Sequence, residues 1–204
     1  MTGIYANSIK DQTGTRQLAS DSGSAWSWGS SVPKGSVIEQ FCSPCDGSSI
    51  TVQSGTYTVE TVSAVQTLSL THTKIEGSQI SYTPPTGTQT VVYEFNFFAS
   101  KHDDTNAMFH VKATIAGADV DRSRTTFRSS DEPEGRHHMM WAFGIGSDVA
   151  TTGRVATWTS AKVINLKARD YSSGFDTNLH ETLNWDGSSG TILSMPIIKI
   201  TALA

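Results

Sequence analysis

Alternating apolar and polar positions run through most of the chain and predict a protein built from short β-strands. The pattern is clearest at 88–100, where the residues that share one apolar face are Val91, Tyr93, Phe95, Phe97 and Ala99. Further strands are predicted at 36–41, 56–62, 67–75, 107–115, 118–128, 136–146 and 160–171. No stretch has the apolar period of about 3.6 residues that indicates a helix.

Many strands without intervening helices favour an all-β fold, an antiparallel β-sandwich of the jelly-roll type. An immunoglobulin-like sandwich is the alternative, but its Cys and Trp spacing is missing. We expect residues 36–204 to form the jelly-roll domain and residues 1–35 to form a short, extended N-terminal arm. Trp26 and Trp28 share one strand face in this arm and are costly to leave in water, so they are predicted to attach it to its own domain, to sister chains or to a larger assembly.

The last predicted strand is apolar on both sides. Its two faces carry Ile192, Pro196 and Ile198 on one side, and Leu193, Met195 and Ile197 on the other. A sandwich strand normally faces solvent with one side, so the second apolar face needs a cover. Burying its large side chains would contribute several kcal/mol to association. An identical neighbour is the simplest cover, and the N-terminal arm or a long loop is the alternative. We assign Leu193, Met195 and Ile197, together with Trp141, to a subunit interface.

Composition and charge exclude several classes of partner. The 204 residues are 37% hydrophobic and 17% charged, and the net charge of -4 gives little attraction for nucleic acid. The N-terminus lacks a secretory signal, and no segment approaches the ~20 apolar residues of a membrane span. We therefore expect a protein made in the cytoplasm, without membrane insertion, nucleic acid or cofactor.

Several polar clusters could hold a metal ion, but each has a simpler interpretation. Cys42 and Cys45 are compatible with a structural turn, a local disulfide or a metal at a subunit junction. His137 and His138 point to opposite faces of a strand, so one is expected to pack beside Met139 and Trp141 and the other to be exposed, with a ring of three His138 side chains as the alternative. The segments 101–106 and 131–135 are interpreted as acidic turns rather than calcium sites.

The segment 171–190 is predicted to be a long loop, and such loops are often functional. Its candidate contacts to a receptor or glycan are Tyr171, Phe175, Asn178, His180, Trp185 and Asp186. Alternatively, Leu179, Leu183 and Trp185 pack the loop onto its own assembly. We expect no enzyme, because no catalytic motif is present; His180 and Glu181 near Asp186 are the one arrangement that would suit a polysaccharide-degrading enzyme.

Three phrases of the sequence resemble a known group of proteins. The phrases are VVYEFNFFASKHDDTNAMFHVKATIAGADV, TTGRVATWTSAKVINLKARDY, and LHETLNWDGSSG followed by SMPIIKITALA. They are similar to the C-terminal domain of structural proteins from marine bacteriophages. Those proteins are tail-fibre or capsid-fibre components of the virion. The resemblance implies a C1q/TNF-like jelly roll that forms a homotrimer with the last strand near the threefold axis.

The same resemblance implies that residues 1–35 attach the domain to other virion proteins. No long shaft is present, which favours a compact knob or a capsid decoration. The expected function is host-surface binding or shell stabilisation on the virion. The alternative is a carbohydrate-binding lectin domain or a polysaccharide-degrading enzyme.

Overall fold

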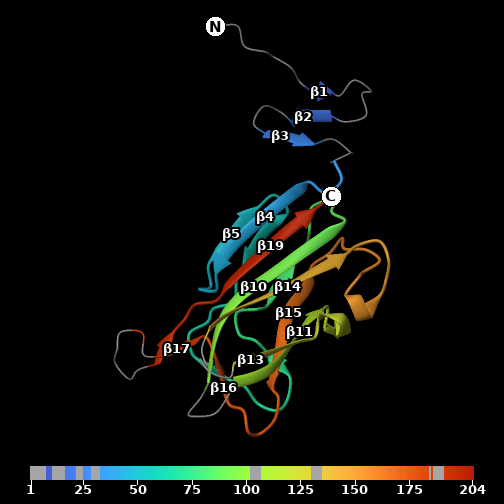
Figure 1. Cartoon of the computed structure of the whole chain (residues 1–204). Helices are drawn as coiled ribbons and strands as arrows, with labels where there is room; N and C mark the ends of the chain where they lie inside the picture. The colour runs from blue at the N-terminus through green and yellow to red at the C-terminus, as the bar shows by residue number, and fades with distance from the viewer. Residues whose placement is uncertain are drawn as a thin grey trace.

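A computed structural model describes residues 8–10, 17–21, 25–28, 33–101, 107–129, 135–183, 185 and 191–204. Its main body is a sandwich of two antiparallel β-sheets (Figure 1). The first sheet has β10 (Thr90–Lys101) at its centre, and its other strands are β4 (Val37–Pro44), β19 (Ile197–Leu203), β14 (Gly135–Gly144), β16 (Thr177–Leu179) and β7 (Gln66–Thr67).

The second sheet is built around β11 (Ala107–Ile115) and β15 (Lys162–Asp170). Its other strands are β13 (Thr125–Ser129), β12 (Ala118–Asp119), β8 (Thr73–Lys74) and β9 (Ile80–Tyr82). Two single 3-10 turns, η1 (Asp121–Ser123) and η2 (Ala150–Thr152), are the only helical elements in the described residues.

The connectivity of the eight main strands is that of a jelly roll. In chain order they are β4, β9, β10, β11, β13, β14, β15 and β19. The first sheet pairs the first strand with the eighth, the eighth with the third, and the third with the sixth. The second sheet pairs the second with the seventh, the seventh with the fourth, and the fourth with the fifth. The predicted fold class is therefore confirmed.

Three smaller units accompany the sandwich. A hairpin is formed by β5 (Ser49–Val52) and β6 (Gly55–Thr58), and a two-stranded ribbon by β17 (Glu181–Leu183) and β18 (Thr191–Leu193). In the predicted arm, β1 (Ser8–Lys10), β2 (Gln17–Asp21) and β3 (Ala25–Trp28) pair as a small antiparallel sheet. These segments are extended strands that pair with one another, while the side chains of Trp26 and Trp28 lie outside the description.

Aromatic side chains from both sheets fill the core. All five apolar residues predicted on one face of β10 are buried, and Phe97 packs against Phe109 of β11 at a ring-centroid distance of 6.2 Å. Ile164, Leu166 and Ala168 of β15 are also buried, as their alternation predicts. The inward faces of the long strands are therefore confirmed.

A buried carboxylate fixes the first strand to its neighbours. Glu39 of β4 is 6% exposed and accepts hydrogen bonds from the Ser54 backbone N–H (2.8 Å), the Ser54 hydroxyl (2.6 Å) and the Tyr82 hydroxyl (2.8 Å). The Tyr57 hydroxyl shares the same group by contacting Ser54 Oγ at 2.7 Å. This network joins β4, the β5–β6 hairpin and β9, because buried polar groups require partners.

Several predictions of local structure are wrong. The segment 67–75 is interrupted between β7 and β8, and the segment 118–128 is divided into β12, η1 and β13. The segment 191–198 is two strands rather than one, since β18 ends at Leu193 and β19 begins at Ile197. Pro196 lies between them and has no backbone N–H for a ladder. The segment 171–190 is not one loop, because β16 pairs with the end of β10 and β17 pairs with β18.

Candidate functional site

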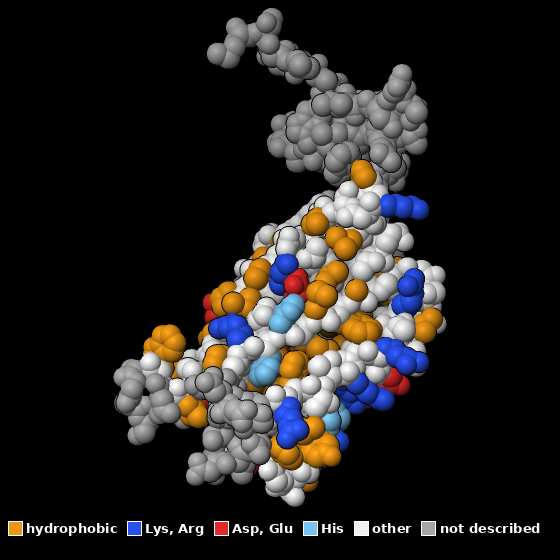
Figure 2. Space-filling view, viewed as in Figure 1, with side chains coloured by type: hydrophobic (Ala, Val, Ile, Leu, Met, Phe, Trp, Pro, Cys, Tyr) orange, Lys and Arg blue, Asp and Glu red, His pale blue; other side chains and the backbone are white. Residues whose placement is uncertain are grey.

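The outward side of the first sheet, here called the front face, is rich in apolar side chains. It consists of the outward residues of β4, β19, β10 and β14, and Met140 and Val37 are 56% and 54% exposed there. The other apolar residues on this face that remain at least partly exposed are Val92, Phe98, Ala142, Ile197 and Leu203. Figure 2 shows hydrophobic side chains spread over this side of the molecule.

The charges in the middle of the front face neutralise one another. Glu94 of β10 contacts Lys199 Nζ of β19 through Oε2 at 2.7 Å, and His138 Nε2 of β14 through Oε1 at 3.5 Å. The register of the sheet makes this possible, because Glu94 lies directly opposite Lys199. The centre of the face is thus a compensated polar group surrounded by apolar surface. The sequence alone does not indicate these partners, since they come from distant strands.

The predicted interface residues fall into two groups. Ile197 lies on the front face, and β19 is an interior strand between β4 and β10. By contrast, Leu193, Met195 and Trp141 are partly buried against the core of their own chain. Trp141 also donates its indole N–H to the Thr152 carbonyl at 3.0 Å. Their own subunit supplies most of the cover that these three need, and their interface role stays a prediction.

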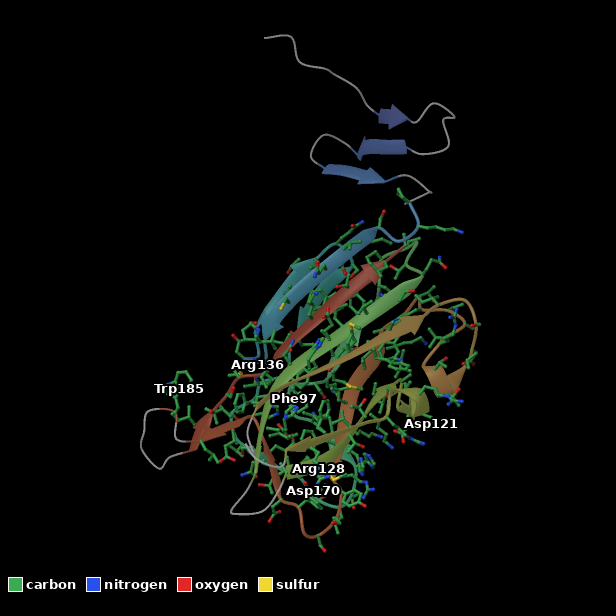
Figure 3. All side chains as sticks on the ribbon, viewed as in Figure 1. Phe97, Asp121, Arg128, Arg136, Asp170 and Trp185 are labelled. Atoms are coloured by element: carbon green, nitrogen blue, oxygen red, sulfur yellow. The ribbon has the colours of Figure 1, made fainter. Side chains whose placement is uncertain are left out.

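The ribbon β17–β18 carries the most exposed large apolar side chain among the described residues. Trp185 is 76% exposed and Ile192 is 39% exposed. Figure 3 shows Trp185 pointing away from the sandwich, at the ribbon. An exposed Trp of this kind is a common binding anchor. Asp186, which was predicted beside it, lies outside the described residues.

Two further predicted contact residues meet at the turn after β15. Tyr171 is 48% exposed, and its ring lies 5.5 Å from that of Phe175 and 5.6 Å from that of His110. The Phe175 backbone N–H donates to the Ser172 carbonyl at 3.0 Å, which folds the turn back. The structure therefore brings Tyr171 and Phe175 together on the surface, and it adds His110, which the sequence did not suggest.

Asn178 and His180 are not on the surface, so their predicted contact with a receptor or glycan is wrong. Asn178 is 4% exposed, accepts a hydrogen bond from the Thr67 hydroxyl and donates to Glu181 Oε2, both at 2.7 Å. His180 is fully buried with a left-handed φ of 64°. The short strand β16 hides both side chains because it adds to the sheet at the end of β10.

The buried groups around His180 also lack the access that a glycosidase needs. Glu181 is 4% exposed and accepts a hydrogen bond from the Ser100 hydroxyl at 2.6 Å. Burial lowers the pKa of His180 to about 4, opposed by the Glu76 backbone carbonyl. Burial also raises the pKa of Asp170, on β15, to about 6. His180, Glu181 and Asp170 are all covered by their own chain.

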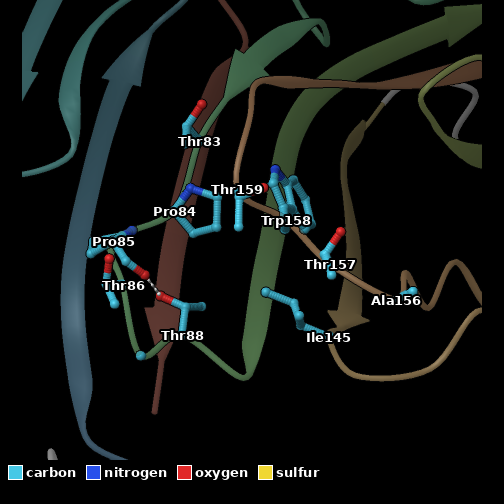
Figure 4. Close-up of a pocket in the computed structure, with 11 residues that line it drawn as sticks. Thr83, Pro84, Pro85, Thr86, Thr88, Ile145, Ala156, Thr157, Trp158 and Thr159 are labelled. Carbon is cyan, nitrogen blue, oxygen red and sulfur yellow. Dashed lines mark hydrogen bonds between the residues drawn. The ribbon is translucent and has the colours of Figure 1, made fainter. Parts of the chain in front are cut away.

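A neutral cavity of about 340 Å³ opens between the connections that flank β10 and β15 (Figure 4). Its lining residues are Thr83, Pro84, Pro85, Thr86, Gly87, Thr88, Ile145, Ala156, Thr157, Trp158 and Thr159. Trp158 is 4% exposed and donates its indole N–H to the Tyr82 carbonyl at 2.9 Å. The lining has no titratable side chain, so it offers no acid, base or metal ligand.

The cysteines and histidines have structural surroundings. Cys42 is exposed on β4 and Cys45 is buried, both thiols are free, and burial raises the pKa of Cys45 to about 12. The alternative of a local disulfide is therefore wrong, and so is a turn at Cys42, which lies within the strand. His137 lies on the same inward side of β14 as Met139 and Trp141, with its ring centroid 5.7 Å from that of Phe97, while His138 is exposed, as the alternation predicts.

No group of three His, Cys, Asp or Glu side chains within the described ranges is placed to hold a metal. The proposed calcium or turn segments at 102–106 and 131–134 lie outside those ranges. Among the described residues, no helix has the length and apolar character needed to cross a membrane.

Comparisons with known proteins give little further information. No protein-family model and no curated protein matches the sequence. Among solved structures, the CBM36-1 domain of a multidomain xylanase from the hindgut metagenome of Trinervitermes trinervoides matches with 12% identity and a TM-score of 0.32, covering 79% of this chain and 96% of that domain. A structure of infectious bursal disease virus, Gt strain, matches with 8% identity and a TM-score of 0.25, covering 92% of this chain and 52% of that one. TM-scores this low carry no argument about function.

Proposed function

We propose that the protein is a non-enzymatic, homotrimeric jelly-roll component of a bacteriophage virion that binds the host surface. The observation that carries this proposal is the front face, where apolar side chains surround a neutralised Glu94–Lys199 pair. Large exposed apolar patches mark interaction sites, and fully burying one aliphatic side chain is worth about 1.5–3 kcal/mol. Identical neighbours would cover this face, and the sequence resemblance to phage appendages supports threefold symmetry.

The two ends of the sandwich suit different partners. At one end the Gly35 backbone N–H donates to the Ala204 carbonyl at 2.6 Å, so the chain enters the domain beside its own C-terminus. At the other end of β19, about 20 Å away, the β17–β18 ribbon carries Trp185. The proposed arrangement attaches the N-terminal arm to other virion proteins and presents Trp185 and Tyr171 to the host.

Binding to cells tests the host-surface role. The purified full-length protein should adhere to bacteria that the phage infects and should compete with the phage for adsorption. Resistant strains provide the control. Failure to bind any susceptible strain, with the protein shown to be folded by circular dichroism, would contradict host binding. Release of oligosaccharides from host polysaccharide would contradict the non-enzymatic role.

A further inference from the structure

The outward side of the second sheet carries a row of three lysines. Lys112 of β11 lies directly opposite Lys167 of β15, and Lys167 lies directly opposite Lys74 of β8. Neighbouring strands are about 4.8 Å apart, so the three side chains start within roughly 10 Å of one another. Like charges directly opposite each other on a sheet are destabilising.

The nearby carboxylates do not balance this row. Asp119 is shared by two ammonium groups, at 2.5 Å from Lys112 Nζ and 3.2 Å from Lys167 Nζ. Glu60 pairs with the third lysine. Arg169 is two residues along β15 from Lys167 and therefore shares its face, and no ion pair reaches it from the part of the chain that the structure describes. A protein with a net charge of -4 thus presents one locally basic face.

Two histidines on the same side have pKa values that are lowered first by burial and then by this positive charge. Burial and then the cations Lys112 and Arg169 lower the pKa of His72, and burial and then Arg169 lower the pKa of His110. Both imidazoles are therefore neutral at pH 7. The positive charge of the face is therefore that of its lysine and arginine side chains.

Aromatic rings continue the same surface. Tyr171 follows β15 two residues after Arg169, and its backbone N–H donates to the Met108 carbonyl of β11 at 2.9 Å. Its half-exposed ring lies between His110 and Phe175. The surface therefore places lysine and arginine cations beside aromatic rings on the outward side of the second sheet.

We infer that this basic face, composed of Lys74, Lys112, Lys167 and Arg169 with Tyr171 and Phe175 at its rim, binds a carboxylate-bearing polysaccharide of the host surface. The inference rests on the proposed function and names its ligand class. Arginine binds carboxylates through paired hydrogen bonds, and lysine adds charge. The rings supply apolar contact for the sugar faces.

Polygalacturonate, a linear polymer with one carboxylate per sugar, is the probe, and its fully methyl-esterified form is the matched neutral control. Binding of the full-length protein is measured by calorimetry at low and physiological salt. The variant is Lys167→Gln with Arg169→Gln; the control is Lys34→Gln with Arg122→Gln, which changes the net charge equally at exposed positions elsewhere. Removing Lys167 relieves like-charge contacts, so the variant should fold, and thermal unfolding checks this.

The wild-type protein should bind polygalacturonate and not its ester, and the Lys167/Arg169 variant should bind about tenfold or more weakly. The control variant and the wild type should bind alike. Equal loss in both variants, or binding of the ester, would overturn the inference, as would tighter binding of polyphosphate or duplex DNA. Cell adhesion without polygalacturonate binding would reject this ligand class alone, whereas polygalacturonate binding without adhesion would reject the proposed host role.

Discussion

Replacing Glu39 with alanine should destabilise the domain more than any single surface change. The side chain is 6% exposed and accepts three hydrogen bonds, from Ser54 N–H, Ser54 Oγ and Tyr82 OH. Each buried donor left without an acceptor costs about 1–3 kcal/mol. Ser54 is only partly buried and regains water, so we expect a loss of about 3–5 kcal/mol in the free energy of unfolding.

Urea unfolding followed by tryptophan fluorescence, at one fixed protein concentration, measures this loss. Tyr82→Phe removes a single donor and should cost about 1–2 kcal/mol. Glu76→Ala is the matched control, because Glu76 is exposed, and it should change stability by less than about 0.5 kcal/mol. A Glu39→Ala protein within about 1 kcal/mol of the wild type would refute the view that this network anchors β4.

Three other predictions concern pH, the ribbon and the front face. The pKa of His180 is lowered from 6.5 to about 4, so its contribution to the free energy of unfolding is lost as pH falls from 6.5 to 4. The pKa of Asp170 is raised from 3.8 to about 6, so its contribution to the free energy of unfolding grows as pH falls from 6 to 3.8. The two effects oppose each other. When pH is lowered from 6.5 to 4, the Asp170→Asn variant should therefore lose about 2–3 kcal/mol more free energy of unfolding than the wild type, as measured by urea unfolding. Equal losses in the variant and the wild type would contradict this opposition. Trp185→Ala should leave the melting temperature unchanged, since the side chain is 76% exposed, but should weaken adhesion to host cells; equal adhesion would remove Trp185 from the contact. Met140→Glu places a second carboxylate directly opposite Glu94 on the front face, so it should dissociate the assembly, as measured by light scattering. Val163→Glu, on the other sheet, should leave the assembly intact. The reverse result would show that the interface lies on the second sheet.

The long strands could be predicted from the sequence because their alternation reports burial directly. Phe97 and Phe109 lie on the faces that their periodicity assigns, and the segment 107–115 coincides with β11. A period of two residues specifies which face is buried whatever the partner strand is. Tyr171 and Phe175 are predicted as surface aromatics from the loop-like composition of 171–190, which does not indicate that they lie together.

The features that failed depend on contacts between distant parts of the chain. Asn178 and His180 read as polar loop residues, and only the pairing of β16 with β10 and β7 buries them. The two-faced apolar tail predicted one continuous strand, whereas β18 pairs with β17 and β19 lies between β4 and β10. The lysine row likewise arises from the register of β11, β15 and β8, which sequence spacing does not specify.

The assembly of the protein in solution tests the central claim most directly. Multi-angle light scattering of the purified full-length protein should give about 66 kDa, three times the 21.9 kDa of one chain, and the value should persist on dilution. A mass of 21.9 kDa at every concentration would show that the front face has no identical neighbour to cover it, and it would contradict the trimeric appendage.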